Sequence, residues 1–224
     1  MCGRFALKAP PAKLIQRFEL DECVDFLPHP NIAPGTDIPV IRLSPEGKRV
    51  LHLLRWGLVP HWAKDASIGA KLHNARSETL SEKPSFREAF KKRRCLIPAD
   101  GFYERKTEGK TKQPYCFSLK SKETMALAGL WESWRAPDGS ILRSVTIITM
   151  EANEMMRPIH HRMPMILGSK DWREWLGITP IIDAIPIVKP VEIELQKEAV
   201  RRLTNAEVQK GVSEFLCKRG FGYS

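Results

Sequence analysis

The sequence predicts an α+β protein built on curved, mostly antiparallel β-sheets, barrel-like in form, with short helices at the periphery. Many short segments have the alternating apolar pattern of strands, whereas helical segments are few and brief. The chain never alternates a strand with a long helix, as a doubly wound sheet would require. With 224 residues, we expect one domain over residues 2–176 and a C-terminal extension, residues 177–224, that packs on it.

Strands are expected where β-branched, aromatic or alternating apolar residues run between turn formers. The first covers residues 3–7. A hairpin follows, with strands at residues 38–43 and 50–59 around a Ser-Pro-Glu-Gly turn. Further strands are expected at residues 94–98, 101–105, 115–119, 125–131, 142–150 and 163–167.

The expected helices are shorter. Residues 11–20 place Leu14, Ile15 and Phe18 at helical spacing behind an initial proline. Residues 85–92, 151–157 and 171–176 also favour short helices, and residues 60–73 form an irregular segment. Within the extension, residues 191–220 are expected to be partly helical, with apolar positions at Leu195, Ala199, Leu203 and Val208.

Charge and composition favour a soluble protein with a polyanionic partner. Hydrophobic residues make up 42% and charged residues 28% of the chain, which is an ordinary globular composition. The net charge of +10 favours nucleic acid, although a basic surface can also serve solubility alone. Neither a signal peptide nor a membrane-spanning run is visible. We therefore expect a cytoplasmic, nucleoid-associated protein that does not bind a membrane.

The cysteines indicate a reducing compartment. There are five of them, an odd number, with no C-x-x-C pair and no His/Cys cluster at zinc spacing. We expect free thiols, no metal site and no cofactor. Three thiols lie in apolar runs and are expected to be buried as small hydrophobic side chains: Cys95, Cys116 and Cys217.

Cys2 stands apart because removal of Met1 would leave it with a free α-amine. That amine titrates near ~8 and is partly neutral at pH 7. An amine and a thiol on one residue can both add to one aldehyde and close a five-membered thiazolidine. The alternative is an unstructured chain end, which is the usual state of a terminus. Gly3 and Arg4 favour the first interpretation, because they allow a close backbone approach and a phosphate contact.

Three further segments carry polar groups suited to a site. In the segment NARSET, residues 74–79, Asn74 offers a hydrogen-bond donor and an acceptor, and Arg76 offers a forked donor. The alternative is that this segment is only the polar start of a helix. Glu104 follows two aromatic residues, so burial among them would suit it as a general acid or base. The alternative is an exposed Glu104 that pairs with a lysine. His160 and His161 point to opposite faces in an extended chain, so one can move protons, or both are structural.

Aromatic and basic residues also alternate between residues 55 and 64. Aromatic rings stack on unpaired bases while cations follow the phosphates. Trp56 lies in a predicted strand and is expected in the core, whereas Trp62 lies in a loop and is the better stacking candidate.

Six segments in register resemble the SOS response-associated peptidase (SRAP) family, whose members process abasic sites. The likeness covers roughly residues 2–176 and also includes AGLW at residues 128–131. Each segment is short, but the six together are specific. They are MCGRF at residue 1, NIAPG at 31, RWGLVP at 55, NARSE at 74, CLIPADGFYE at 95 and HHRMP at 160.

The resemblance implies a compact α+β domain with a basic cleft for single-stranded DNA and a covalent link between Cys2 and an abasic-site aldehyde. It places Asn74, Glu104 and His160 at the other active-site positions. It also implies loss of Met1 by self-processing and slow reversal of the link, and a lingering Schiff base would give weak lyase activity. Residues expected to contact DNA are Arg4, Pro34, Trp62 and Arg76, with Arg162 as a further phosphate-binding candidate.

Two features depart from the family pattern. His161 stands where the family often has Asp, and the usual closing Pro-Val-Ser motif is not visible in residues 178–224. Two other functions remain open: a thiol hydrolase using Cys2, His160 and Asn74, and a noncatalytic single-stranded DNA-binding module. For each of these functions, including abasic-site processing, we expect a monomer.

Overall fold

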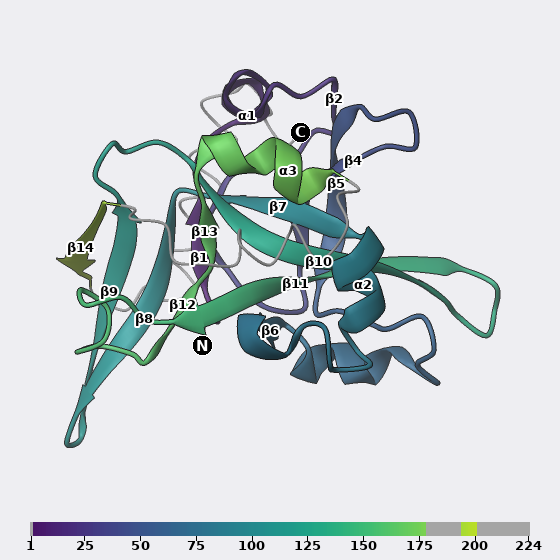
Figure 1. Cartoon of the computed structure of the whole chain (residues 1–224). Helices are drawn as coiled ribbons and strands as arrows, with labels where there is room; N and C mark the ends of the chain where they lie inside the picture. The colour runs from purple at the N-terminus through teal and green to yellow at the C-terminus, as the bar shows by residue number, and fades with distance from the viewer. Residues whose placement is uncertain (1, 178–193, 201–224) are drawn as a thin grey trace, which may run out of the picture.

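The computed structural model describes residues 2–177 and 194–200, and their strands form two sheets (Figure 1). The five-stranded sheet has the order β14-β9-β8-β1-β3. Its strands are antiparallel, as predicted. They are β1 (Phe5–Leu7), β3 (His29–Ile32), β8 (Gly101–Glu108), β9 (Thr111–Leu119) and β14 (Leu195–Ala199).

The nine-stranded sheet of the described residues has the order β12-β11-β10-β7-β4-β5-β2, with β13 paired to β10 and β6 paired to β11. Most pairs are antiparallel, and β6, β5 and β2 make parallel ones. Its strands are β2 (Glu22–Cys23), β4 (Asp37–Leu43), β5 (Arg49–Trp56), β6 (Asn74–Arg76), β7 (Arg94–Ala99), β10 (Met125–Arg135), β11 (Ile141–Glu151), β12 (Arg162–Pro164) and β13 (Ile166–Leu167).

The larger sheet closes on itself. β11 pairs with β10 along one edge and with β5 along the other, where Val145 is opposite Trp56. The strands β11, β10, β7, β4 and β5 therefore form a ring, which confirms the predicted barrel-like form. Its interior is apolar, with Ile38, Ile97 and Trp56 each 0% exposed.

The helices are short and peripheral, as predicted. They are α1 (Pro11–Phe18), α2 (Arg87–Lys92) and α3 (Trp172–Leu176), with 3-10 turns η1 (Ala66–Lys71), η2 (Ser77–Thr79) and η3 (Ser169–Asp171). In α1, Leu14 and Phe18 are buried while Ile15 remains exposed. Phe18 stacks on Trp172 at 4.6 Å between ring centroids, which fixes α1 against the start of α3.

Two expected helices are wrong. Residues 151–157 end β11 and then form a turn. Asn153 accepts hydrogen bonds from the backbone N–H groups of Met156 and Arg157, but Pro158 has no N–H to continue a helix.

The second correction concerns the extension. Residues 195–199 form the edge strand β14 and pair with β9 from Leu195↔Leu119 to Ala199↔Tyr115. The open edge of β9 satisfies the backbone groups of this segment, and that pairing overrides its helical composition. Leu203 and Val208, also expected in that helix, lie outside the described residues.

Candidate active site

Cys2 lies at the start of β1 and is 0% exposed. Antiparallel pairing with β8 holds this end of the chain, since Phe5 faces Phe102 and the Tyr103 N–H donates to the Arg4 carbonyl at 2.9 Å. The Asn74 side-chain amide donates to the Cys2 carbonyl at 2.8 Å. The second residue is therefore fixed in the fold, and the unstructured-terminus interpretation is wrong.

Asn74 reaches Cys2 from the barrel wall. It begins β6, which runs parallel to β11 with Asn74 opposite Ile147, so residues 74–76 form a strand and the helical turn η2 begins only at Ser77. While its Nδ2 bonds Cys2, its Oδ1 is buried and has no hydrogen-bond partner among the described residues. An unsatisfied buried acceptor is costly, and an added amine or hydroxyl donor would relieve that cost.

Glu104 of β8 supplies a buried carboxyl group to the same region. Glu104 is 8% exposed, and burial raises the pKa of its carboxyl group above the ordinary value. Burial, together with the negative charge of Glu104, raises the pKa of the Cys2 thiol to about 12. The thiol is therefore protonated at neutral pH, and the two groups are close enough to sense each other's charge.

His160 precedes β12 and is half-buried, whereas His161 is exposed and stacks on it at 4.6 Å between ring centroids. The Arg162 N–H donates to His160 Nδ1 at 3.0 Å, so the neutral ring carries its proton on Nε2. The Arg162 carbonyl, 3.1 Å from the same Nδ1, is then a contact and not a hydrogen-bond acceptor. Burial lowers the pKa of His160, which favours the neutral ring.

The guanidinium of Arg162 makes contacts within the fold through both of its terminal nitrogens. It donates to both carboxylate oxygens of Glu78, at 2.7 and 3.0 Å, and to the Thr149 carbonyl at 2.6 Å. The Arg162 residue is 7% exposed. The structure therefore places Arg162 as a link between β12, β11 and η2, an arrangement that differs from the exposed phosphate contact expected from the sequence.

The other expected DNA contacts lie at the surface. Arg4 and Arg76 are exposed and flank Cys2 and Asn74 in the chain, while Pro34 is half-buried. The Arg4 guanidinium is 3.4 Å from Asn31 Oδ1 on β3. Arg4 lies two residues after Cys2 and Arg76 two residues after Asn74, and neither forms a buried ion pair with another described residue.

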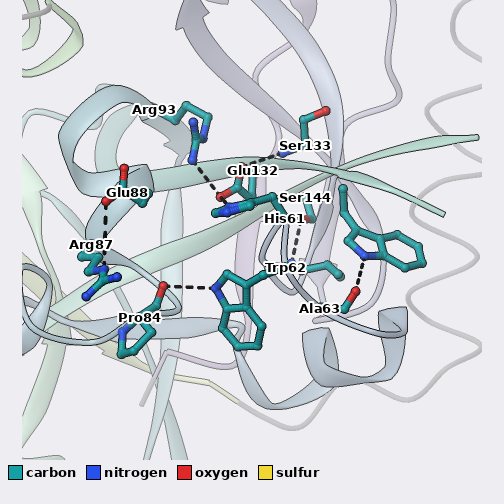
Figure 2. A network of polar contacts seen from close by, with 12 residues as sticks. His61, Trp62, Ala63, Pro84, Arg87, Glu88, Arg93, Glu132, Ser133 and Ser144 are labelled. Atoms are coloured by element: carbon teal, nitrogen blue, oxygen red, sulfur yellow. Dashed lines mark hydrogen bonds and ion pairs between the residues drawn. The ribbon is translucent and has the colours of Figure 1, made fainter.

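Trp62 is 49% exposed, whereas Trp56 is 0% exposed, as expected for a loop and a core residue. The Trp56 indole N–H donates to the His73 carbonyl at 2.8 Å, and its ring packs on Phe5 at 5.2 Å between centroids. Trp62 presents its ring from the loop before η1 and donates at 3.4 Å to the Pro84 carbonyl (Figure 2).

A buried carboxylate anchors the loop that carries Trp62 (Figure 2). Glu132 of β10 is 3% exposed, pairs with Arg93 at 2.8 Å and lies 3.4 Å from the His61 ring. On either side of Trp62, the Val59 N–H donates to the Ser144 hydroxyl and the Ala63 carbonyl accepts from the Trp134 indole, each at 2.8 Å. The sequence offered no sign of Glu132, because its partners come from distant segments.

The thiols differ in burial. All the described cysteines are free, and Cys95 is 0% exposed, as predicted. Cys116 is half-buried because it lies on the smaller sheet beside the edge strand, so its expected full burial is wrong. Cys217 lies outside the described residues. Within the described part of the chain, no group of three or more His, Cys, Asp or Glu side chains could hold a metal ion, and no helix could cross a membrane.

Together, fold and site define a small β-barrel protein with a thiol, an amide and a carboxyl group gathered at its amino-terminal strand. A sequence model of the SOS response associated peptidase (SRAP) family matches residues 1–212. The chain belongs to this family. The match continues past Pro164, where the last of the individual motifs ends, and includes β14.

Named relatives and solved structures agree with this assignment. Abasic site processing protein YoqW of Bacillus subtilis is 49% identical over 184 residues, spanning 79% of this chain and 80% of the relative. Abasic site processing protein HMCES of Xenopus tropicalis is 33% identical over 199 residues, spanning 75% of this chain and 59% of the relative. A crystal structure of a Bacteroides thetaiotaomicron protein has a TM-score of 0.83 at 27% identity, over 90% of this chain and 93% of that one.

Proposed function

We propose that this protein binds abasic sites in single-stranded DNA and traps their aldehyde as a thiazolidine on Cys2 after Met1 has been removed. The observation that carries the proposal is the placement of Cys2, fixed by a 2.8 Å hydrogen bond from Asn74 and within electrostatic reach of Glu104. The names of the relatives, abasic site processing proteins, support the same lesion as substrate.

The amine reacts first in this scheme. Burial and the charge of Glu104 raise the pKa of the Cys2 thiol, so the thiol is protonated at pH 7 and the amine is the better first nucleophile. The free amine of Cys2 adds to the aldehyde carbon, and loss of one water gives an imine. The thiol sulfur then adds to the imine carbon and its proton passes to the ring nitrogen. One C–N and one C–S bond form as the C=O bond breaks, so no oxidant or reductant is required.

Glu104 and His160 divide the proton transfers. The Glu104 carboxylate takes the proton of the incoming amine and returns it to the departing water, for which a raised pKa is suited. His160 holds its proton on Nε2, because Nδ1 accepts from the backbone, and this proton assists opening of the deoxyribose ring to its aldehyde. Asn74 Oδ1 orients the terminal amine.

Recognition of the strand rests on the exposed residues. Arg4 and Arg76 contact the phosphates on either side of the lesion, and Trp62 stacks on an unpaired base. Pro34 packs against the strand. A duplex would hide the sugar, so gaps and single strands are the preferred substrates. Arg162 instead positions His160 through their shared backbone contacts.

The same groups account for processing of the protein. Hydrolysis of the Met1–Cys2 bond frees the amine, and water reverses the ring by the reverse sequence of steps. An imine that persists would promote β-elimination at the sugar, giving weak lyase activity. We place this activity inside the cell, with the protein acting as a monomer.

A covalent-adduct assay tests the proposal. The protein is incubated with abasic and intact single-stranded oligonucleotides, denatured, and separated on a gel. We expect an adduct with the abasic strand alone, and Cys2→Ala should abolish it without loss of noncovalent binding. A Cys2→Ala protein that still formed the same stable adduct would overturn the proposal.

Two controls separate the other functions. An acetylated Cys2 amine should block the adduct, whereas a thiol hydrolase would tolerate that change and cleave peptides. Equal affinity for intact and abasic strands, with no adduct, would instead indicate a noncatalytic DNA-binding module. The papain-like arrangement is already disfavoured, because the Asn74 amide bonds Cys2 and the His160 Nδ1 is taken by the backbone.

A further inference from the structure

The two ends of the barrel differ in chemistry. Near one end Phe5 packs on Trp56, and Asn74, opposite Ile147 of β11, binds Cys2. Towards the other end, β11 carries Arg143, four residues or about 13 Å from Ile147 along the strand. This second end also carries Arg42, His52 and Trp131, and none of these residues takes part in the function proposed above. We call these four residues the barrel mouth.

The strand register shows that the barrel mouth residues all belong to the inner face of the barrel. Alternate residues of a strand share a face, and directly paired residues share that face with their partners. Arg42 shares its face with Val40, which is paired with His52. His52 shares its face with Trp56, which is paired with Val145 of β11. Val145 lies opposite Trp131 and shares its face with Arg143.

These side chains also interact. The Arg42 guanidinium lies over the Trp131 ring, 5.0 Å from its centroid. Burial lowers the pKa of His52, and the positive charges of Arg42 and Arg143 lower it further. The barrel mouth is therefore a concentrated patch of positive charge beside an aromatic wall. Mouths of β-barrels are a common place for ligands to bind.

Two nitrogen atoms in the barrel mouth lack partners. Arg42 Nε and His52 Nδ1 are buried and have no hydrogen-bond partner among the described residues. The remaining bond of Arg42 is weak, a 3.4 Å contact from Nη1 to the Leu43 carbonyl. Buried polar atoms are nearly always hydrogen-bonded to protein, water or an ion. These two nitrogen atoms therefore indicate that a ligand binds in the barrel mouth.

Within the part of the chain that the structure describes, nearby acid does not neutralise this charge. Glu22 of β2 is the acidic residue whose charge raises the pKa of His52, and it is exposed and lies 3.7 Å from Lys48. Its carboxylate therefore already has a cationic partner and is largely hydrated. Two guanidinium groups are left facing one imidazole at the end of a closed barrel.

We infer that the barrel mouth binds a phosphate-type oxyanion, with Arg42 Nε and Arg143 as donors and the His52 ring as a further donor through Nδ1. A planar guanidinium held on an aromatic ring is well suited to a tetrahedral oxyanion, since it offers donors in a fixed direction. The same chemistry fits free phosphate or a phosphodiester of a DNA strand, and the experiment separates these sources. This inference does not depend on the chemistry of Cys2.

The test is an NMR titration of the full-length wild-type protein with inorganic phosphate, at constant ionic strength maintained with chloride. The signals followed are the His52 ring and the Arg42 Nε–H. We expect saturable shifts of both, with binding at least about tenfold weaker in Arg143→Gln, as loss of one charge-assisted hydrogen bond implies. Arg143 is exposed, so this variant should keep its fold.

A matched control is Arg55→Gln. Arg55 lies on β5 with His52 but on the opposite face, and it pairs with Asp37 at 2.9 Å. Its loss should leave phosphate binding unchanged. The inference would be overturned by any of three results. These are the absence of saturable shifts, equal shifts with chloride alone, and unchanged phosphate binding in both Arg143→Gln and Arg42→Gln.

The source of the oxyanion is tested in a second arm. An intact single-stranded oligonucleotide, which has no aldehyde, is added in place of phosphate. The same His52 and Arg42 shifts, competing with phosphate, would assign the barrel mouth to a DNA phosphodiester. Phosphate shifts without oligonucleotide competition would assign it to a free phosphate compound. Both results are consistent with an oxyanion site and differ only in its natural ligand. The phosphate titration and the arginine variants described above test whether the site exists.

Discussion

Arg162 and Glu78 form a two-point ion pair, with guanidinium nitrogen to carboxylate oxygen distances of 2.7 and 3.0 Å. Arg162 follows His160 in the chain, and Glu78 follows β6, which begins with Asn74. The pair therefore holds together the segments that bring in two of the proposed active-site residues. The hydrogen bond from Arg162 also lowers the pKa of Glu78, so the pair persists at acidic pH.

We expect Arg162→Lys to slow adduct formation more than it weakens DNA binding. Lysine keeps the charge but cannot donate to two oxygens in a plane, so His160 loses its fixed position. Unfolding by denaturant should show a loss of about 1.5–3 kcal/mol, the usual effect of losing a charge-assisted hydrogen bond. Arg157→Lys, an exposed position in the preceding turn, is the control. Weaker DNA binding at an unchanged adduct rate would return Arg162 to the phosphate contacts.

Removal of the Asn74 amide should affect chemistry before it affects affinity. In Asn74→Ala the Cys2 carbonyl loses its 2.8 Å donor, and the terminal residue is free to rotate. A misplaced nucleophile commonly costs up to about 100-fold in rate, whereas one lost hydrogen bond costs about 1 kcal/mol of stability. Single-turnover adduct rates and oligonucleotide affinities measure the two effects. A full-speed reaction in Asn74→Ala would show that Asn74 does not orient Cys2.

The strands were predictable because their signal is local. Alternating apolar residues placed β4, β5, β7, β10 and β11 to within a few residues, and a Ser-Pro-Glu-Gly turn located the first hairpin. The edge strand β14 was not, since LQKEA has helical composition and is a strand only because β9 offers an open edge. Pairing that depends on a distant partner leaves little trace in the segment itself.

The same distinction applies to the site. Cys2, Asn74 and Glu104 were identified because their motifs, taken together and in order, resemble one family, although each motif alone also allowed a structural interpretation. Arg162 was placed among the DNA contacts because an arginine beside a histidine suits phosphate, and its partner Glu78 lies 84 residues earlier. Only the three-dimensional pairing of β6 and β12 with β11 brings that carboxylate within reach.

The raised pKa of Glu104 predicts opposite effects of one substitution on activity and stability. Burial favours the protonated acid, so the folded-state pKa exceeds the unfolded one. Such a group contributes fully to stability below the unfolded pKa, and its contribution is lost as pH rises through the folded value. Glu104→Gln should therefore gain stability over the wild type as pH rises above about 4.5, the ordinary value, while adduct formation slows.

Denaturant unfolding of both proteins between pH 4 and pH 8, with adduct rates at each pH, measures the two effects. The wild-type adduct rate should increase with pH as Glu104 ionises, and that dependence should flatten in Glu104→Gln. Glu151→Gln, at an exposed position on β11, is the control for a change of net charge. A stability difference that stayed constant across this range would mean that Glu104 has the same pKa in both states.

Trp62 and Glu132 provide a prediction about binding alone. Trp62→Ala should weaken single-stranded DNA binding by about 1–3 kcal/mol, the usual contribution of one aromatic ring stacked on a base. Glu132→Gln should weaken it too, because the 2.8 Å ion pair with Arg93 is lost and the loop beside it loosens. If Glu132 acts only by holding that ring in place, Glu132→Gln in a Trp62→Ala background should have no further effect on affinity. Additive losses in the double variant would instead mean that Glu132 supports DNA binding by a separate route.

A further variant tests the loop without changing a charge. Trp134→Phe removes the indole donor to the Ala63 carbonyl while keeping an aromatic ring.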